Sequence, residues 1–202
     1  MNNLLAFYRG LIAQNRRWFW AVVIVFLIGF VSGVSISLVA PSVTQTIIDE
    51  YASSLDPSVK PGLPLSLYVF ERNAIIVLIT TVGGFLFGLL PVVVGFMNGL
   101  VLGALVGFPQ IYQALNPVQL FFLIAPHGIF EYAGSLLALS FGLKLGLNWL
   151  FGAARGKRKM VFFTDLKETL AIIPLTLALL LAAAFVEGTL TTNIACFVAG
   201  AC

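Results

Sequence analysis

The fold follows from residues 74–108, AIIVLITTVGGFLFGLLPVVVGFMNGLVLGALVGF, which contain no charged residue in 35 positions. A single straight helix of this length would measure about 52 Å, whereas the hydrocarbon core of a bilayer is about 30 Å thick. The run must therefore fold back, either by crossing the membrane twice or by entering and returning on the same side. Gly88 and Pro91 mark the expected break, which gives two short spans at residues 73–90 and 92–108.

The composition extends this conclusion to the whole chain. Of the 202 residues, 60% are hydrophobic and only 9% are charged, and the mean hydropathy is +1.04. These values exclude a soluble domain and predict a single all-α membrane domain over residues 1–202, a helical bundle of about five spans. The net charge of +3 is small and lies beside apolar segments, so it gives no indication of nucleic acid as a partner.

The remaining spans are predicted by the other long apolar runs. We expect the first span at residues 18–40, the fourth at 126–150 and the last at 169–190. The first run is long enough to span, so we expect it to stay as an anchor instead of being removed as a signal peptide. Residues 109–125 are uncharged but contain several Gln and Asn residues, and we expect an interfacial loop there.

Three polar segments flank or connect these spans. Residues 1–17 predict an amphipathic helix on the cytoplasmic surface. Residues 41–72 predict an outer, extracytoplasmic loop that contains a short helix, and residues 151–168 predict a basic cytoplasmic loop. Within the basic loop, Asp165-x-x-Glu168 resembles a capping box that would start the last helix.

The charges of these segments predict the orientation of the protein. Residues 1–17 contain three arginines and no acidic residue, and residues 151–168 contain five basic and two acidic residues. Residues 41–72 contain two basic and four acidic residues. Because positive segments stay inside, we expect a multi-pass plasma membrane protein with its amino terminus inside and its carboxyl terminus outside. Lys144 is expected to extend to the cytoplasmic surface and receives no functional role.

The fourth span carries the most informative polar residues. His127, the only histidine, and Glu131 are four residues apart and therefore share one face of a helix. Glu187 ends the last span, and a helix carboxyl end disfavours a carboxylate. In the predicted topology the three residues have a similar depth, so antiparallel packing of the last two spans would bring Glu187 to His127 or to the first amides of the fourth helix.

Three explanations of this polar cluster stay open. The residues could fasten helix ends through hydrogen bonds, they could form an ion, proton or substrate site, or His127, Glu131 and Glu187 could bind a metal. Asn73 and Asn98 are amides in or beside apolar spans, where they could bond neighbouring helices or line a polar cavity. From the sequence we assign no metal ion, no cofactor and no catalytic residue.

Glycine spacing predicts close helix packing. Glycine lacks a side chain, so neighbouring helices can approach until their backbones touch. The packing can be within one subunit, or it can be between subunits of a homo-oligomer. The predicted positions are Gly84, Gly88, Gly95, Gly99, Gly103 and Gly107.

Two further features concern redox state and enzyme class. Cys196 and Cys202 follow the last span on the outer side, where a disulfide would be permitted if a tight turn brings them together.

The sequence has no His-Glu-x-x-His zinc helix, no Gly-x-Ser-x-Gly elbow and no phosphate-binding glycine loop that ends in Lys-Ser/Thr. These absences set aside several hydrolase classes.

Four motifs together resemble those of one family, the stage II sporulation protein M family. They are Asn73 followed by GGFLFGLLP at residues 83–91, Asn98-Gly99 with Gly103, PHGIFE at residues 126–131, and AAFVEG at residues 183–188. The resemblance covers roughly residues 70–190, and Pro-His-Gly with the glutamate three residues on is its most specific part. The motif positions of the family correspond here to Asn73, Asn98, His127, Glu131 and Glu187.

The resemblance implies a small integral membrane protein with about five spans, and it carries over no established catalytic activity. In spore formers, members of this family hold a complex with cell-wall hydrolases during engulfment, and similar proteins occur in bacteria and archaea that make no spores. The leading hypothesis is therefore a non-enzymatic membrane scaffold that contacts lipid and other membrane or envelope proteins. A transporter or channel-like permease is the alternative, because broken helices with polar groups mark transport sites. An intramembrane metal-dependent hydrolase is a weaker alternative.

Overall fold

The computed structural model describes residues 2–54, 56–152 and 156–199, and these residues form helices without a strand. In chain order the helices are α1 (Asn2–Gln14), α2 (Arg16–Val39), α3 (Pro41–Ser53), α4 (Leu63–Val82), η1 (Gly83–Phe85), α5 (Leu89–Gly107), α6 (Ile111–Ala114), α7 (Pro117–Leu147), η2 (Asn148–Gly152), α8 (Arg158–Val186), η3 (Glu187–Thr191) and α9 (Thr192–Ala199). Five helical stretches are long and apolar enough to cross a membrane: Arg16–Val39, Leu63–Phe85, Leu89–Gly107, Pro117–Gly152 and Arg158–Phe197. The predicted all-α membrane fold is confirmed.

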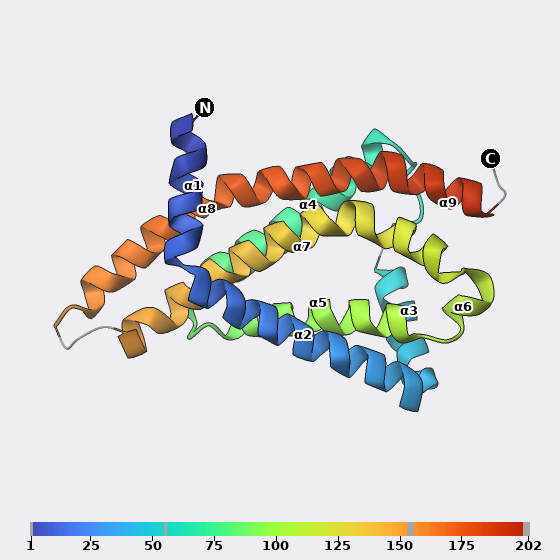
Figure 1. Ribbon diagram of the computed structural model, residues 1–202, viewed down its shortest axis with the longest axis horizontal. Coiled ribbons are helices and arrows are strands. Elements are labelled where there is room, and N and C mark those ends of the chain that lie inside the picture. Colours follow the sequence, from blue (N-terminus) through green and yellow to red (C-terminus); the bar gives the residue numbers. More distant parts are fainter. Residues whose placement is uncertain (1, 55, 153–155, 200–202) are drawn as a thin grey trace.

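The long helices run along one axis and give the molecule two distinct ends (Figure 1). One end, which we call the Lys144 end, contains α1, the turn between α4 and α5, and the start of α8. The opposite end, which we call the His127 end, contains α3, α6 and η3. Each of the five long stretches runs from one end to the other, so consecutive ones alternate in direction.

The uncharged run folds back on itself, but the break lies earlier than the sequence suggests. The first helix of the run, α4, ends at Val82, and a 3-10 turn leads to Gly88, which has a φ of 68°. This left-handed conformation favours glycine, because a side chain would crowd the backbone. Pro91 is the third residue of α5 and does not break the helix, since the first turn needs no hydrogen bond from its nitrogen.

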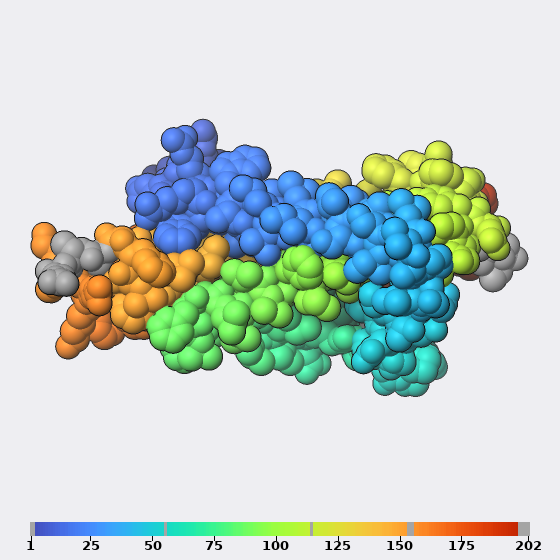
Figure 2. Space-filling model, turned by 90° about the horizontal axis from the view of Figure 1, so that it is seen from below, coloured from blue at the N-terminus to red at the C-terminus, as the bar shows by residue number. Residues whose placement is uncertain are grey.

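Glycines bring α2 and α5 into backbone contact along their length. A Cβ atom at Gly99 would overlap the carbonyl oxygen of Phe26, and one at Gly103 would overlap that of Phe30. From the other side, a Cβ atom at Gly29 would overlap the carbonyl oxygen of Phe96. Figure 2 shows the two helices side by side, with α3 crossing them at the His127 end. At these positions the packing is within one chain.

The turn between α4 and α5 packs equally closely on α7 at the Lys144 end. A Cβ atom at Gly84 would overlap the carbonyl oxygen of Gly142, and one at Gly146 would overlap the amide nitrogen of Gly88. Gly95 differs, because its Cβ atom would meet Val22 Cγ1 at 3.6 Å, an ordinary van der Waals contact. Gly107 packs against α2, where its Cβ atom would lie 2.8 Å from the Cα atom of Val34. The predicted glycine positions therefore do not all have the same tolerance for a side chain.

The helix of the fourth span begins earlier than predicted, and most of the expected interfacial loop is helical. Helix α6 lies within residues 109–125, and α7 already starts at Pro117. A capping box starts α7: the Asn116 side chain accepts a hydrogen bond from the Gln119 amide, and the Gln119 side chain accepts one from the Asn116 amide. The polar residues that suggested a loop thus form a helix start.

The last long helix also begins earlier, which corrects two expectations. Helix α8 starts at Arg158, so Asp165 and Glu168 lie inside it and do not cap it. The basic loop is correspondingly short, and residues 153–155 lie outside the described part. Both carboxylates bind Lys144, which is buried with 6% of its surface exposed and does not extend to the surface as expected. A charge buried in this way is costly unless it is paired, and the two carboxylates supply the partners.

The amino-terminal helix is part of the bundle at the Lys144 end. Leu11 of α1 is buried against Leu137 and Phe141 of α7 and Ile172 of α8. Nearer the amino terminus of α1, Leu4 and Leu5 are exposed, 61% and 65% respectively. The apolar residues of α1 therefore pack against the bundle only in the second half of the helix.

Candidate functional site

The polar residues predicted for the outer cluster come together at the His127 end. His127 and Glu131 project from one face of α7, and Glu187 lies where α8 passes into the π-helical turn η3. One possible ligand atom from each of the three side chains lies within 4.8 Å of the other two. The antiparallel packing of α7 and α8 thus brings Glu187 to a histidine that is 60 positions away in the sequence.

Local packing explains why Glu187 has this position. Gly188 lets the end of α8 approach the start of α4 so closely that a Cβ atom would overlap Ser66 Oγ. The carbonyl oxygen of Gly188 accepts a hydrogen bond of 2.8 Å from the Gly62 amide. Both Glu187 and Gly188 belong to the π-helical turn η3, a rare form that is frequent at functional sites. Glu187 is therefore held at a fixed junction of three elements.

Two of the three side chains have a hydrogen-bond partner. The amide nitrogen of Asn73 on α4 donates to Glu131 Oε1 at 3.1 Å, and His127 Nδ1 lies 3.1 Å from Thr191 Oγ1. Among the described residues, the Glu187 carboxylate accepts no hydrogen bond. Two carboxylates and an imidazole therefore converge while each keeps at least one free ligand atom.

All five sequence-predicted residues line one cavity of about 500 Å³. Asn98 of α5 belongs to this lining together with Asn73, His127, Glu131 and Glu187, although its amide has no hydrogen bond within the described residues. Apolar residues of α5 and α7, among them Leu105 and Leu123, form other parts of the wall. Asn73 and Asn98 thus line a common cavity, and Asn73 also bonds a neighbouring helix through Glu131.

The structure adds cavity residues that sequence reasoning missed. Arg72 and Tyr68 of α4, Tyr51 of α3, Tyr132 of α7 and Thr191 of η3 all line the same cavity. The only sequence signal was position, because Arg72 precedes Asn73, Tyr132 follows Glu131, and Thr191 lies one turn after Glu187. Nothing in the local pattern of α3 indicates that it would cover a site formed by other helices.

Tyr51 shows that α3 and the cluster are close. Burial raises the pKa of its phenol, and the negative charges of Glu131 and Glu187 raise this pKa further. Tyr51 lines the same cavity as the two carboxylates, although 54% of its surface is exposed. The cavity is thus covered by a helix from outside the predicted spans.

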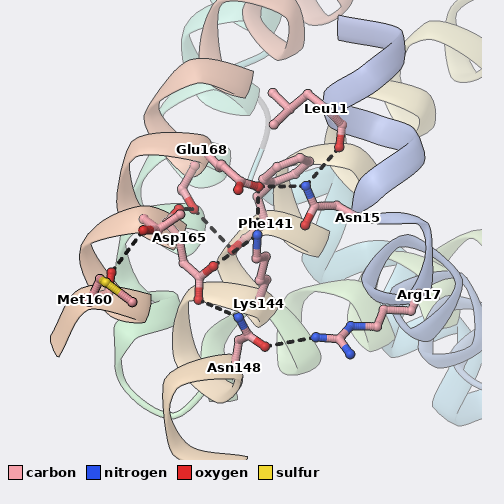
Figure 3. A network of polar contacts seen from close by, with 11 residues as sticks. Leu11, Asn15, Arg17, Phe141, Lys144, Asn148, Met160, Asp165 and Glu168 are labelled. Carbon is pink, nitrogen blue, oxygen red and sulfur yellow. Dashed lines mark hydrogen bonds and ion pairs between the residues drawn. The ribbon is translucent and has the colours of Figure 1, made fainter. Parts of the chain in front are cut away.

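A second polar network, also missed by sequence reasoning, lies at the Lys144 end (Figure 3). Lys144 Nζ lies 3.0 Å from Asp165 Oδ1 and 2.7 Å from Glu168 Oε2. Asn15, between α1 and α2, donates to Glu168 Oε2 at 2.7 Å, and Asn148 donates to Asp165 Oδ2 at 2.9 Å. This network joins α1, α7 and α8, and the ion pairs of Lys144 with both carboxylates indicate a structural role.

Family comparison identifies the group to which the chain belongs. The stage II sporulation protein M family matches residues 22–192, most of the chain and every residue of the cavity cluster. The chain belongs to the stage II sporulation protein M family. It is also 27% identical over 173 residues to an uncharacterized protein, MJ0793, of the archaeon Methanocaldococcus jannaschii, which covers 85% of this chain and 92% of the relative. No solved structure matches the chain.

Membership in the stage II sporulation protein M family supports a membrane location and extends the resemblance to α2. Residues 22–69, which resemble the family only in outline by motif, lie within the matched range. The other predicted site, a disulfide between Cys196 and Cys202, involves a residue outside the described part of the chain and stays a prediction. The membrane topology likewise stays a prediction.

Proposed function

We propose that the protein is a non-enzymatic scaffold of the plasma membrane that presents a fixed surface to other membrane or envelope proteins. The observation that carries this proposal is the attachment of the segment between α2 and α4 to the bundle. This segment, here called the platform, consists of α3, Ser54 and residues 56–62. A segment that only connected α2 to α4 would not need to be attached to the bundle.

Hydrogen bonds hold the platform at several points. Arg72 Nη1 donates to the carbonyl oxygen of Ser54 at 3.0 Å, and the Asp56 amide donates to the Tyr68 hydroxyl at 3.1 Å. At its end, the Gly62 amide donates to the Gly188 carbonyl oxygen. Because these bonds reach α4 and η3, the platform has a defined position relative to the bundle, which lowers the entropy cost of binding a partner.

The charge of the platform favours a basic partner surface. Asp49, Glu50 and Asp56 are exposed, and Lys60 is the only basic residue of the platform. Hydrogen bonds from the Ser58 side chain and amide lower the pKa of Asp56, so its carboxylate stays charged at neutral pH. Complementary charge increases the association rate and selects against wrong partners.

Site-specific crosslinking in living cells tests the scaffold proposal. A photoreactive residue at Glu50 or Lys60 should give a discrete crosslinked protein, and the matched control at Val31, exposed on α2, should not. Charge reversal by Asp49→Lys should lower the yield from the Lys60 position several-fold, whereas Lys159→Glu, at the Lys144 end, should leave the yield unchanged. Equal yields from Val31 and from the platform positions would contradict the proposal.

A permease is the second candidate, and the cavity at the His127 end is the observation that favours it. Polar groups in a cavity between helices are typical of transport sites. Beyond the cavity, however, Val77, Ala138 and Leu180 are at most 5% exposed and pack together. A permease would have to separate these helices in each cycle. Ion or solute flux in proteoliposomes that exceeds the flux of empty liposomes would favour the permease over the scaffold.

A further inference from the structure

We infer that His127, Glu131 and Glu187 form a binding site for Zn²⁺. This inference goes beyond the scaffold proposal and is independent of it, because it rests on the interior of the bundle and not on the platform. The first argument is distance. Ligand atoms of a tetrahedral zinc site lie about 3.4 Å apart, given bonds of about 2.0–2.2 Å. The three ligand atoms here already lie within 4.8 Å of one another, so small side-chain rotations suffice.

The second argument is the orientation of the ligands. In zinc sites, the ring nitrogen that does not bind metal usually bonds a neighbouring group, which fixes the imidazole. Thr191 bonds His127 Nδ1 and leaves Nε2 for the cation. Asn73 supports Glu131 in the same way, by bonding Oε1 and leaving Oε2. Two of the three ligands therefore have an outer partner from a different element.

The third argument is charge. Within residues 2–54, 56–152 and 156–199, neither Glu131 nor Glu187 forms an ion pair. Arg72 also lines the cavity, but its guanidinium group bonds Ser54. Two carboxylates that converge inside a membrane-type bundle repel each other and lose hydration, which is costly. A divalent cation between them would cancel the repulsion and compensate for the lost hydration.

The ligand set selects the cation. Mg²⁺ and Ca²⁺ prefer six or more oxygen ligands, whereas this site offers one imidazole nitrogen and two carboxylates. Such a mixed set suits Zn²⁺, and three protein ligands leave a fourth position on the cavity side for water or a ligand. Because Glu187 belongs to the end of α8, bound Zn²⁺ would join α7 to α8 at the His127 end.

Metal binding to the purified protein tests the inference. The full chain in detergent, freed of metal by a chelator and of any affinity tag, should bind Zn²⁺ at about one ion per chain in a calorimetric titration. Glu187→Gln and Glu131→Gln keep the side-chain shape and should each weaken binding at least ten-fold. Asn73→Ala should weaken it about ten-fold through loss of outer support. The control Glu50→Gln removes the same charge from the platform and should bind like the parent.

Two measurements keep the test decisive if a variant folds poorly. Each variant is compared only when its helix content and its elution as a single species match the parent. Co²⁺ in place of Zn²⁺ should give the visible absorption of a tetrahedral site, and Thr191→Val should alter that spectrum. Zinc binding by Glu187→Gln that equals the parent, or no binding by the parent, would overturn the inference. Neither result would change the crosslinking yield from the platform. The zinc inference and the scaffold proposal can therefore be contradicted independently.

Discussion

At the scale of single residues, the presence of an ion-pair partner distinguishes the two polar clusters. Lys144 is a cation enclosed by two carboxylates. Asn148 donates to the second oxygen of Asp165, and Asn15 donates to the same Glu168 oxygen that Lys144 contacts. The cluster of His127, Glu131 and Glu187 is the reverse case, because neither of its two carboxylates forms an ion pair among the described residues. A network whose charges are paired stabilises a fold, whereas a cluster with unpaired carboxylates can bind a ligand.

Removing Lys144 should therefore destabilise the protein strongly. Lys144→Met leaves Asp165 and Glu168 without their cation, and the loss of one partner in a buried ion pair costs about 3–5 kcal/mol. Unfolding in mixed detergent micelles measures this free energy. The exposed control Lys159→Met should stay within about 0.5 kcal/mol of the parent. Adding Asp165→Asn and Glu168→Gln to Lys144→Met should recover part of the loss, and parental stability of Lys144→Met would show that the network is dispensable.

At the scale of elements, the glycine positions have different roles. Backbone contact between α2 and α5 depends on Gly99 and Gly103, where no room for a Cβ atom exists. Gly95 lies on the same helix, one turn before Gly99, and has room for a methyl group. Equal spacing in the sequence therefore conceals unequal packing, because α2 places side chains of Val22 and Val25 beside Gly95 but backbone atoms beside Gly99 and Gly103.

The contrast between Gly95 and Gly99 gives a matched pair of substitutions. Gly99→Ala forces the α2 backbone away and should cost about 1–3 kcal/mol, and Gly99→Leu should cost more. Gly95→Ala makes ordinary contacts and reduces the entropy of the unfolded chain, so its midpoint of thermal unfolding in detergent should equal or exceed that of the parent. If Gly99→Ala melts at the same temperature as Gly95→Ala, the backbone contact between α2 and α5 is not important for stability.

At the scale of the whole molecule, the two ends differ in charge as they would on the two sides of a membrane. The Lys144 end contains the three arginines of residues 1–17 and the basic start of α8, and the His127 end contains the acidic platform. Between the ends, side chains such as Ile24, Ile28 and Val31 on α2 are more than half exposed and suit a lipid environment. This distribution supports the Lys144 end as cytoplasmic.

Accessibility labelling tests that orientation. After Cys196 and Cys202 are replaced by serine, Lys60→Cys should react with a membrane-impermeant thiol reagent in intact cells. Lys159→Cys should react only after the cells are permeabilised. The two substitutions are chemically identical and both sites are exposed, so only their side of the membrane differs. The opposite labelling pattern would invert the topology and place the platform in the cytoplasm.

The sequence by itself determined the properties that depend on neighbouring residues. The length of the uncharged run required a fold-back, the apolar runs gave five candidate spans, and the four-residue spacing placed His127 and Glu131 on one face. Hydrophobicity and helical periodicity are local, so they are visible without a structure. Helix starts were less predictable, because Asn116 and Gln119 cap a helix with residue types that also form loops.

Only the tertiary structure decided which distant residues meet. It placed Glu187 beside His127, covered the cavity with Tyr51 of α3, and buried Lys144 between Asp165 and Glu168, where the sequence suggested a surface lysine and a capping box. These pairings depend on how helices rotate and shift against each other, and that is set by close packing at glycines such as Gly142 and Gly188. Such contacts join positions far apart in the chain, so no local pattern specifies them.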